Sequence, residues 1–185
     1  FGGKEVRGMR WAGRLHDIGK VGVEDQVLQK PGALDDDEWE AMRRHPALGA
    51  ELLEPLRLTR DLAPVIRYHH ERADGRGYYL VPPDKVPLQA SIVAITDAFD
   101  AMTSDRPYRD ALSFDDALGR IEADAGTQFH AELAVAFVAM MRGQRVPQMT
   151  VEEEGWRGLF KERLHEIRRT RDGSTHADGI AEATA

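Results

Sequence analysis

The stretch HHERADGRGYY, residues 69–79, combines two adjacent histidines with a loop broken by glycines. It follows the apolar run 62–66, a pattern typical of a helix over residues 60–72 that presents imidazoles at its C-terminal end. Gly75 and Gly77 can adopt positive φ and let the backbone approach a ligand closely. A histidine pair alone is equally compatible with partly buried helix-end histidines bonded to carbonyls or carboxylates.

The segment LHDIGK, residues 15–20, places His16 beside Asp17 on another apolar stretch. Burying an unpaired charge there would be costly, and a bound metal would remove that cost. The apolar spacing predicts a helix over residues 4–18 that ends at Gly19, with the two side chains about 100° apart around it. They could therefore straddle two metals, with Asp17 as the bridging carboxylate. The alternative is a core histidine beside a carboxylate that caps the helix end.

Five sequence blocks carry a family resemblance. They are HDIGK at 16–20, KPGAL at 30–34, HPALGAELL at 45–53, HHERADGRGY at 69–78 and TDAFDAMTSDRPYR at 96–109. In this order they resemble the HD-GYP family of metal-dependent phosphodiesterases, a branch of the HD phosphohydrolase superfamily. The resemblance implies an all-α HD-domain helical bundle, with about seven helices around a di- or trinuclear metal site. It implies cyclic di-GMP as the substrate, opened to linear pGpG, and leaves open further cleavage to GMP.

The resemblance also assigns the metal ligands. They are His16, Asp17, His45, His69, His70 and Asp97. Imidazole and carboxylate together suit iron or manganese, with zinc, cobalt or nickel as alternatives. We therefore expect two or three divalent transition metals as cofactors. Two metals would lower the pKa of a shared water, so that a metal-bridging hydroxide could attack phosphorus near neutral pH.

Supporting roles follow from the same resemblance. The predicted catalytic residues are Asp17 and Lys20. The predicted substrate contacts are Lys20, Arg106, Arg109 and Tyr78. Cationic side chains suit this role because they offset phosphoryl charge, although the two arginines could instead neutralise a helix C-terminus. The residues predicted to orient the ligands are Glu71, Asp74 and Asp100.

Two further helices are expected to support the ligands. Residues 35–53 form one, opened by a capping box of Asp35 and Glu38 and kinked at Pro46. Gly49 within it would let another helix approach closely.

The other supporting helix, residues 88–103, is apolar nearly all round and is expected to be central. Asp97 and Asp100 share one of its faces and need a cation or hydrogen-bond donors, and a buried ion pair with nearby arginines is the alternative. Helices are also expected over 113–124 and 130–142.

The sequence departs from the family pattern in three places. Gly77 and Tyr78 are followed by Tyr79 instead of proline, which we expect to soften the loop and to affect substrate positioning or partner docking. His130 stands where the family usually has aspartate, either as a lost cap or as an added imidazole. The family's upstream helix, which brings additional ligands, has no counterpart in this sequence, so the number of metals is open.

Composition limits the class of protein. The 185 residues include 42% hydrophobic and 31% charged residues, as in ordinary globular domains, and no cysteine, so thiolate metal sites are excluded. The formal net charge of −7 argues against a protein that grips a nucleic-acid polymer. No apolar run is long enough for a membrane span and no signal pattern is present, so a cytoplasmic location is the default expectation.

We expect an HD-GYP domain over residues 1–143, an amphipathic helix over 150–170 and a disordered tail over 171–185. Expected partners are the cyclic dinucleotide and an upstream sensory or receiver domain, with a homodimer or docking at the Gly-Tyr-Tyr loop left open. Two alternatives to a cyclic dinucleotide phosphodiesterase remain. One is a catalytically weak regulatory module, and the other is a metallophosphohydrolase acting on another nucleotide.

Overall fold

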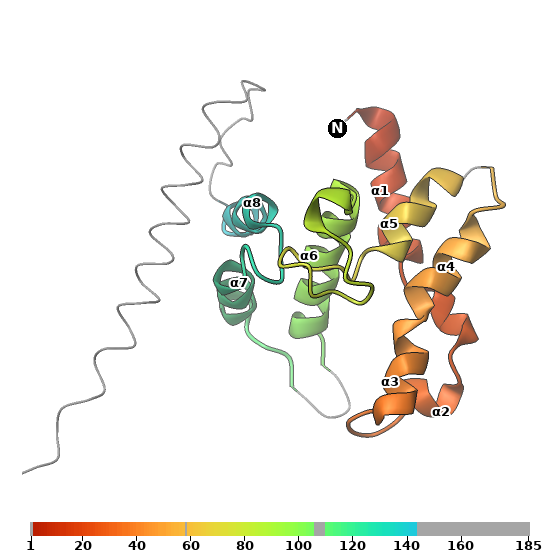
Figure 1. The fold of residues 1–185 in the computed structure, drawn as a ribbon. Helices are drawn as coiled ribbons and strands as arrows, with labels where there is room; N and C mark the ends of the chain where they lie inside the picture. Colours follow the sequence, from red (N-terminus) through yellow and green to blue (C-terminus); the bar gives the residue numbers. More distant parts are fainter. Residues whose placement is uncertain (1, 58, 106–109, 144–185) are drawn as a thin grey trace, which may run out of the picture. The chain divides into compact units, whose positions relative to one another are not determined.

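The computed structural model describes residues 2–57, 59–105 and 110–143, which form helices, turns and loops without a strand (Figure 1). The α-helices in these ranges are α1 (Gly3–Leu15), α2 (Asp25–Leu28), α3 (Asp36–Arg43), α4 (His45–Leu53), α5 (Ala63–Arg67), α6 (Leu88–Thr103), α7 (Phe114–Ala123) and α8 (Ala131–Met141). Three short 3-10 helices accompany them: η1 (Ile18–Gly22), η2 (Arg60–Leu62) and η3 (Pro83–Lys85). The prediction of an all-α fold is confirmed.

Helix α1 ends earlier than predicted, at Leu15, and the chain turns at Asp17 into η1, which packs against α4. Gly19 explains the turn, because a Cβ there would lie 1.9 Å from the carbonyl oxygen of His45. The backbone of η1 therefore rests directly on α4. The prediction that Gly49 permits a close approach is confirmed, since its own Cβ would lie 3.2 Å from the Gly19 nitrogen.

The single helix predicted over residues 35–53 is divided at Arg44 into α3 and α4. Its predicted start is confirmed: the Glu38 amide donates to Asp35 at 3.0 Å, and the Asp35 amide donates back to Glu38 at 2.8 Å. Pro46 accounts for the division. Proline has no N–H to donate to the carbonyl four residues earlier, and its ring crowds that carbonyl.

The helix predicted over residues 60–72 is shorter than expected. It consists of η2 and α5, with Pro64 in the first turn of α5, a position that suits proline. The chain leaves helical geometry at Tyr68, which has φ −111° and ψ 12°. The two adjacent histidines therefore lie in the turn that follows α5.

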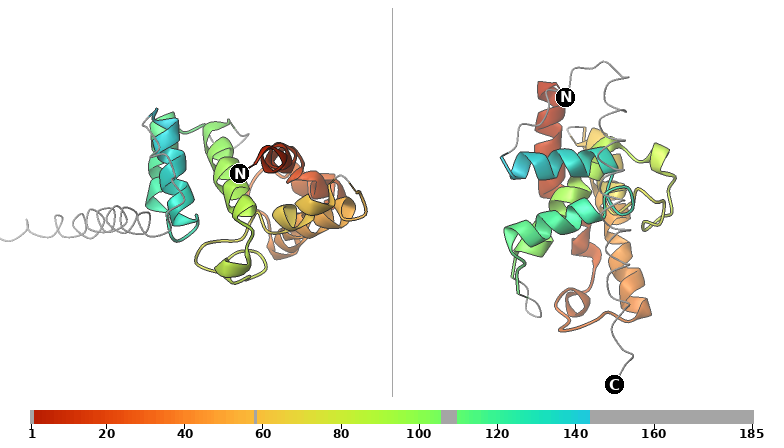
Figure 2. Two further views of the ribbon diagram at one scale, coloured as in Figure 1. Left: turned by 90° about the horizontal axis from the view of Figure 1, so that it is seen from above. Right: turned by 90° about the vertical axis from the view of Figure 1, so that its left-hand side faces the viewer.

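The C-terminal predictions match more closely. Helix α6 has the predicted bounds, and α7 is capped by Ser113, whose hydroxyl accepts the Asp116 amide at 3.1 Å. Figures 1 and 2 show α6 flanked by α1 and α5 on one side and by α7 on the other, in agreement with the contacts between these helices. The central position predicted for α6 is thus confirmed.

The core of the described region contains two buried histidines among its fully buried apolar side chains. His45 and His69 are 1% and 0% exposed, as buried as Ile66 and Ile95. None of the described helices has the length and apolar character needed to cross a bilayer. The predicted helix over 150–170 and the tail over 171–185 lie outside the described residues.

Candidate metal centre

Three of the imidazoles predicted as metal ligands, those of His16, His45 and His69, are held in the same way. In each, Nδ1 lies within hydrogen-bond distance of the carbonyl three residues earlier. The pairs are His16 with Gly13 at 2.8 Å, His45 with Met42 at 2.8 Å and His69 with Ile66 at 2.6 Å. Because a carbonyl can only accept, Nδ1 must carry the proton, which leaves each Nε2 with a free lone pair.

The carbonyls that fix these rings come from helix C-termini, where intrahelical donors are missing. Gly13 and Ile66 lie in the last turns of α1 and α5, respectively. The Met42 carbonyl in α3 is the one that Pro46 cannot bond, so the His45 ring takes the place of the missing N–H. Helix ends thus supply both the position and the tautomer of the three histidines.

The free nitrogens belong to rings that lie close together. The Nε2 atoms of His16, His45 and His69 are buried and have no hydrogen-bond partner. The His69 ring lies 5.2 Å from that of His16, 5.4 Å from that of His45 and 4.1 Å from that of His70. Buried polar atoms are normally satisfied, so three orphaned acceptors in one place indicate a ligand that accepts their lone pairs.

Electrostatics keep the two adjacent histidines neutral. Burial lowers the pKa of His69 to about 4 and that of His70 to about 3. Both imidazoles are therefore unprotonated at pH 7, the state in which imidazole binds a metal.

Asp17 lies between the imidazoles. Its Oδ1 is 3.2 Å from His45 Nε2, while Oδ2 is 3.5 Å from His16 Nε2 and 2.5 Å from Lys20 Nζ. Burial alone would raise the pKa of Asp17, but the proximity of His45 and the hydrogen bond from Lys20 outweigh it and hold the pKa well below its usual range. Asp17 is therefore an anion whose two oxygens face different histidines.

Asp97 on α6 approaches from the other side, with Oδ1 3.4 Å from His16 Nε2. Its carboxylate raises the pKa of His16, and burial only partly offsets this effect. Burial raises the pKa of Asp97 itself, but the interaction with His16 outweighs it and leaves the pKa lowered. In the metal-free protein Asp97 therefore favours the protonated form of His16, and a metal bound at Nε2 would replace that proton.

The donor set fits a transition metal. One ligand atom from each of Asp17, His45, His69 and His70 lies within 4.8 Å of the others. Asp17 also belongs to a second group, with His16 and Asp97. Nitrogen and oxygen donors of this kind suit divalent iron, manganese or zinc. All six predicted ligands are therefore brought together.

Comparison with known proteins identifies the family. A family model described as an HD domain matches residues 3–133. The chain belongs to the HD domain family. Three relatives are similar to this HD domain over about 70% of the present chain.

The cyclic di-GMP phosphodiesterase response regulator RpfG of Xanthomonas campestris is 44% identical over 68% of this chain and 34% of its own length. The 3'3'-cGAMP-specific phosphodiesterase 3 of Vibrio cholerae is 40% identical over 69% of this chain and 28% of its own length. A cyclic di-GMP phosphodiesterase of Thermotoga maritima is 36% identical over 73% of this chain and 38% of its own length. The chain thus spans about a third of the length of these relatives, and their names agree with the resemblance to the HD-GYP family.

Two residues predicted to orient the ligands, Glu71 and Asp74, form hydrogen bonds within the loop of this HD domain. The Glu71 carboxylate accepts the amides of Tyr79 at 2.7 Å and Val81 at 3.0 Å. Asp74 accepts two guanidinium bonds from Arg72, at 3.0 and 2.8 Å. Both carboxylates are thus engaged within the loop and not with a ligand histidine.

Asp100, the third residue predicted to orient the ligands, is exposed on α6, so its side chain needs no buried partner. Arg106 and Arg109 lie outside the described residues. His130 is not part of the ligand cluster among the described residues, although its Nδ1 is buried without a hydrogen-bond partner.

The loop is firmly attached, contrary to the softening expected from the missing proline. The Tyr79 amide makes the bond to Glu71, which proline could not donate. The Tyr79 hydroxyl donates to the Arg43 carbonyl at 3.0 Å and accepts the Ala47 amide at 3.2 Å. Tyr79 therefore replaces proline's rigidity with bonds to the junction of α3 and α4.

Tyr78 and Lys20 are predicted substrate contacts, and both lie beside residues predicted to bind metal. The Tyr78 ring stacks on that of His70 at 4.6 Å, and Lys20 is bound to Asp17. Sequence reasoning missed Arg43, which donates to the Tyr78 carbonyl at 2.7 Å and lies over its ring at 5.3 Å. No motif marks Arg43, because its role depends on the loop folding back onto α3.

Proposed function

We propose that this HD domain is a metal-dependent phosphodiesterase that opens cyclic di-GMP, or a related cyclic dinucleotide, to the linear form. For cyclic di-GMP the product is pGpG, and further cleavage to GMP is left open. Relatives that are 36–44% identical and carry the names of cyclic di-GMP and 3'3'-cGAMP phosphodiesterases support this substrate class.

The observation that carries the proposal is the set of three fixed imidazoles with orphaned Nε2 atoms around one anionic carboxylate. Each ring is locked in the tautomer that binds a metal, which is the usual effect of a hydrogen bond on the opposite nitrogen. A purely structural histidine would not need a free, buried lone pair. Three such histidines together support a metal centre over a satisfied core.

We propose that Asp17 is shared by two metals. One position would use His45, His69 and His70, and the other His16 and Asp97. The contacts of both Asp17 oxygens support this division. Iron or manganese is favoured by the mixture of imidazole and carboxylate. Such metals, when bound, polarise a phosphoryl oxygen and activate water for attack on phosphorus.

The chain's own residues have three tasks in this proposal. Asp17 stays ionised because Lys20 and the histidines stabilise its negative charge. Lys20 is 39% exposed at its side chain, so it can also face the phosphoryl oxygens of a substrate. Neutral His69 and His70 supply ligands without having to lose a proton at pH 7.

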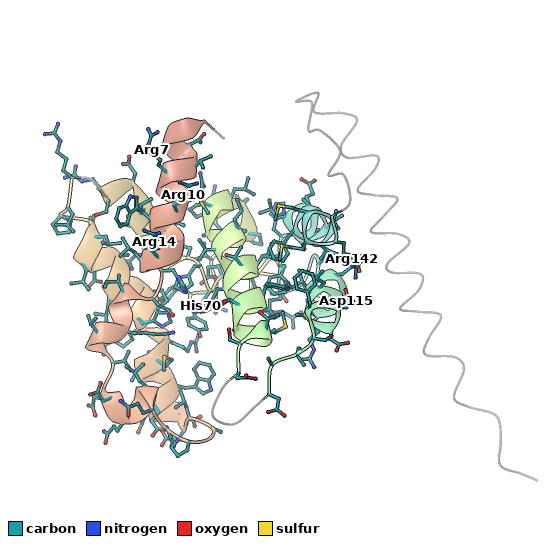
Figure 3. All side chains as sticks on the ribbon, turned by 180° about the vertical axis from the view of Figure 1, so that it is seen from behind. Arg7, Arg10, Arg14, His70, Asp115 and Arg142 are labelled. Carbon is teal, nitrogen blue, oxygen red and sulfur yellow. The ribbon has the colours of Figure 1, made fainter. Side chains whose placement is uncertain are left out.

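The test combines metal analysis of protein purified without oxygen with product analysis on cyclic di-GMP and 3'3'-cGAMP. Asp17→Ala is compared with Asp115→Ala, an exposed residue on α7 (Figure 3). We expect two or more metals per chain and linear product, both reduced in Asp17→Ala and unchanged in Asp115→Ala. Bound metal without product from any metal form would favour the regulatory module. Product only from another nucleotide, in a wider substrate panel, would favour the metallophosphohydrolase that acts on that nucleotide.

Other partners stay predictions. One relative is named a response regulator, which supports coupling to a receiver domain. A homodimer, docking at the Gly-Tyr-Tyr loop and a cytoplasmic location rest on the sequence alone.

A further inference from the structure

Helix α3 presents a large aromatic side chain that the fold does not bury. Trp39 is 47% exposed, and no residue of α3 is fully buried. The helix is nevertheless well anchored, by its capping box and by a salt bridge between Lys30 and Glu38. The indole of Trp39 is thus carried by an anchored helix and is about half exposed to solvent.

Ring contacts connect this indole to the metal centre. Trp39 meets Tyr78 edge to face, with centroids 6.4 Å apart and an interplanar angle of 84°. Tyr78 in turn stacks on His70 at 4.6 Å and 29°. The indole therefore lies two ring contacts from a predicted metal ligand, on an aromatic wall made of His70, Tyr78 and Trp39.

Tyr78 is already occupied by protein neighbours. His70 stacks on it, and Arg43, one turn from Trp39 on α3, lies over its ring and binds its carbonyl. Tyr78 is half-buried in this environment, and this burial raises the pKa of its hydroxyl. Trp39 is the member of the wall that keeps nearly half of its surface free.

We propose that Trp39 is a purine-binding residue that stacks on a base of the substrate while the adjoining phosphodiester lies at the metal centre. This inference rests on the proposed function, because a cyclic dinucleotide carries a purine next to each phosphate. A half-exposed indole beside the site offers a stacking partner for a purine. A protein ligand is the other occupant that the test distinguishes.

The experiment compares Trp39→Leu and Trp39→Phe with Trp11→Leu in manganese-loaded protein. Trp11 is a matched control, because it is 54% exposed on α1. Steady-state kinetics use cyclic di-GMP and methyl p-nitrophenyl phosphate, a diester that has no purine. Binding of GMP is followed by the quenching of tryptophan emission.

We expect Trp39→Leu to raise KM for cyclic di-GMP about tenfold, with kcat and the cleavage of methyl p-nitrophenyl phosphate nearly unchanged. Trp39→Phe should retain most of the affinity but lose the quenching by GMP, because it keeps an aromatic plane and loses the fluorophore. Trp11→Leu should match the wild type in both measurements.

An unchanged KM in Trp39→Leu, or quenching that survives in Trp39→Phe, would overturn the purine site in favour of a surface for a protein, while leaving the enzyme proposal intact. An equal loss on both substrates would overturn it in favour of a structural role. If the wild type cleaves methyl p-nitrophenyl phosphate but neither cleaves a cyclic dinucleotide nor binds GMP, the substrate proposal fails and the purine site fails with it.

Discussion

Two adjacent parts of one short stretch have different environments. His69 and His70 belong to the candidate metal centre, with unprotonated rings and a free Nε2 on His69. Glu71 and Asp74, which follow within four residues, bind backbone amides and a guanidinium. The boundary falls where the turn after α5 ends.

The difference shows what each part of the motif contributes. The histidines depend on what is missing around them, because their nitrogens need a ligand from outside the protein. The carboxylates are satisfied within the loop, so they fix its shape with or without a metal. Removal of either part should therefore affect a different property of the protein.

The largest expected effect is on the histidine side. His69→Ala should reduce metal content and lower activity by more than about a hundredfold, because loss of a mere supporting contact to a ligand already costs about 10- to 100-fold. His130→Ala is the control, since it removes a buried imidazole outside the cluster. Metal analysis and turnover of cyclic di-GMP measure both variants, and equal effects would contradict the assignment of His69.

Gly19→Ala tests the support beneath the cluster. Its Cβ would overlap the His45 carbonyl, so we expect a loss of about 3 kcal/mol in the free energy of unfolding. In Gly13→Ala a Cβ would meet no atom within 4 Å, and the variant should gain up to about 1 kcal/mol because alanine favours helix. Urea unfolding compares the two, and a Gly19→Ala protein as stable as the wild type would refute the tight packing of η1 on α4.

The pH dependence of metal-free protein sharpens the comparison further. The pKa of His69 falls from about 6.5 in the unfolded chain to about 4 in the folded protein, and that of His70 to about 3. Between these values the unfolded chain binds more protons, so stability is complete above pH 6.5 and declines as the pH falls. Each histidine should contribute a slope of about 1.4 kcal/mol per pH unit.

Urea unfolding at pH 7, 5.5 and 4.5 measures this slope. His69→Gln removes one titrating group and should lower the slope by about one proton, whereas an unchanged slope would show that His69 is not responsible. The raised pKa of His16 acts in the opposite direction, and its contribution is lost as the pH rises above the usual histidine range.

On the carboxylate side, Glu71→Gln should lower the free energy of unfolding, measured by urea, by about 2 kcal/mol. An amide side chain cannot accept both backbone N–H groups as strongly as a carboxylate does. The metal content of this variant should equal that of the wild type. Arg72→Gln is a milder loop variant for comparison, since Arg72 is only partly buried. Loss of metal from Glu71→Gln would show that the loop and the cluster are not separate.

Much of this arrangement could be predicted from the sequence. The six residues predicted as ligands from a resemblance of ordered blocks lie together in the structure, and helix α6 followed from an uninterrupted apolar pattern. The capping signals of Asp35 and Ser113 also placed two helix starts correctly. These features depend on residues close together in the chain.

The features that the sequence did not predict arise where distant segments meet. Gly19 turns the chain because its backbone rests on α4. Neither the sequence around Gly19 nor that of α4 reveals this contact by itself. The roles of Glu71 and Asp74 depend on a loop that folds back by several residues. Likewise, Tyr79 could only be read as a lost proline until its amide and hydroxyl were seen to bind Glu71 and the α3–α4 junction.

The histidine–carbonyl bonds at the ends of α1, α3 and α5 have a consequence for folding. Metal bound by His16, His45 and His69 would act as a cross-link between three separate helix ends and, through Asp97, a fourth helix. Closing these long chain segments in the unfolded state carries an entropic cost that a bound ion would help to repay. Resistance to proteolysis in this domain should therefore follow its metal content.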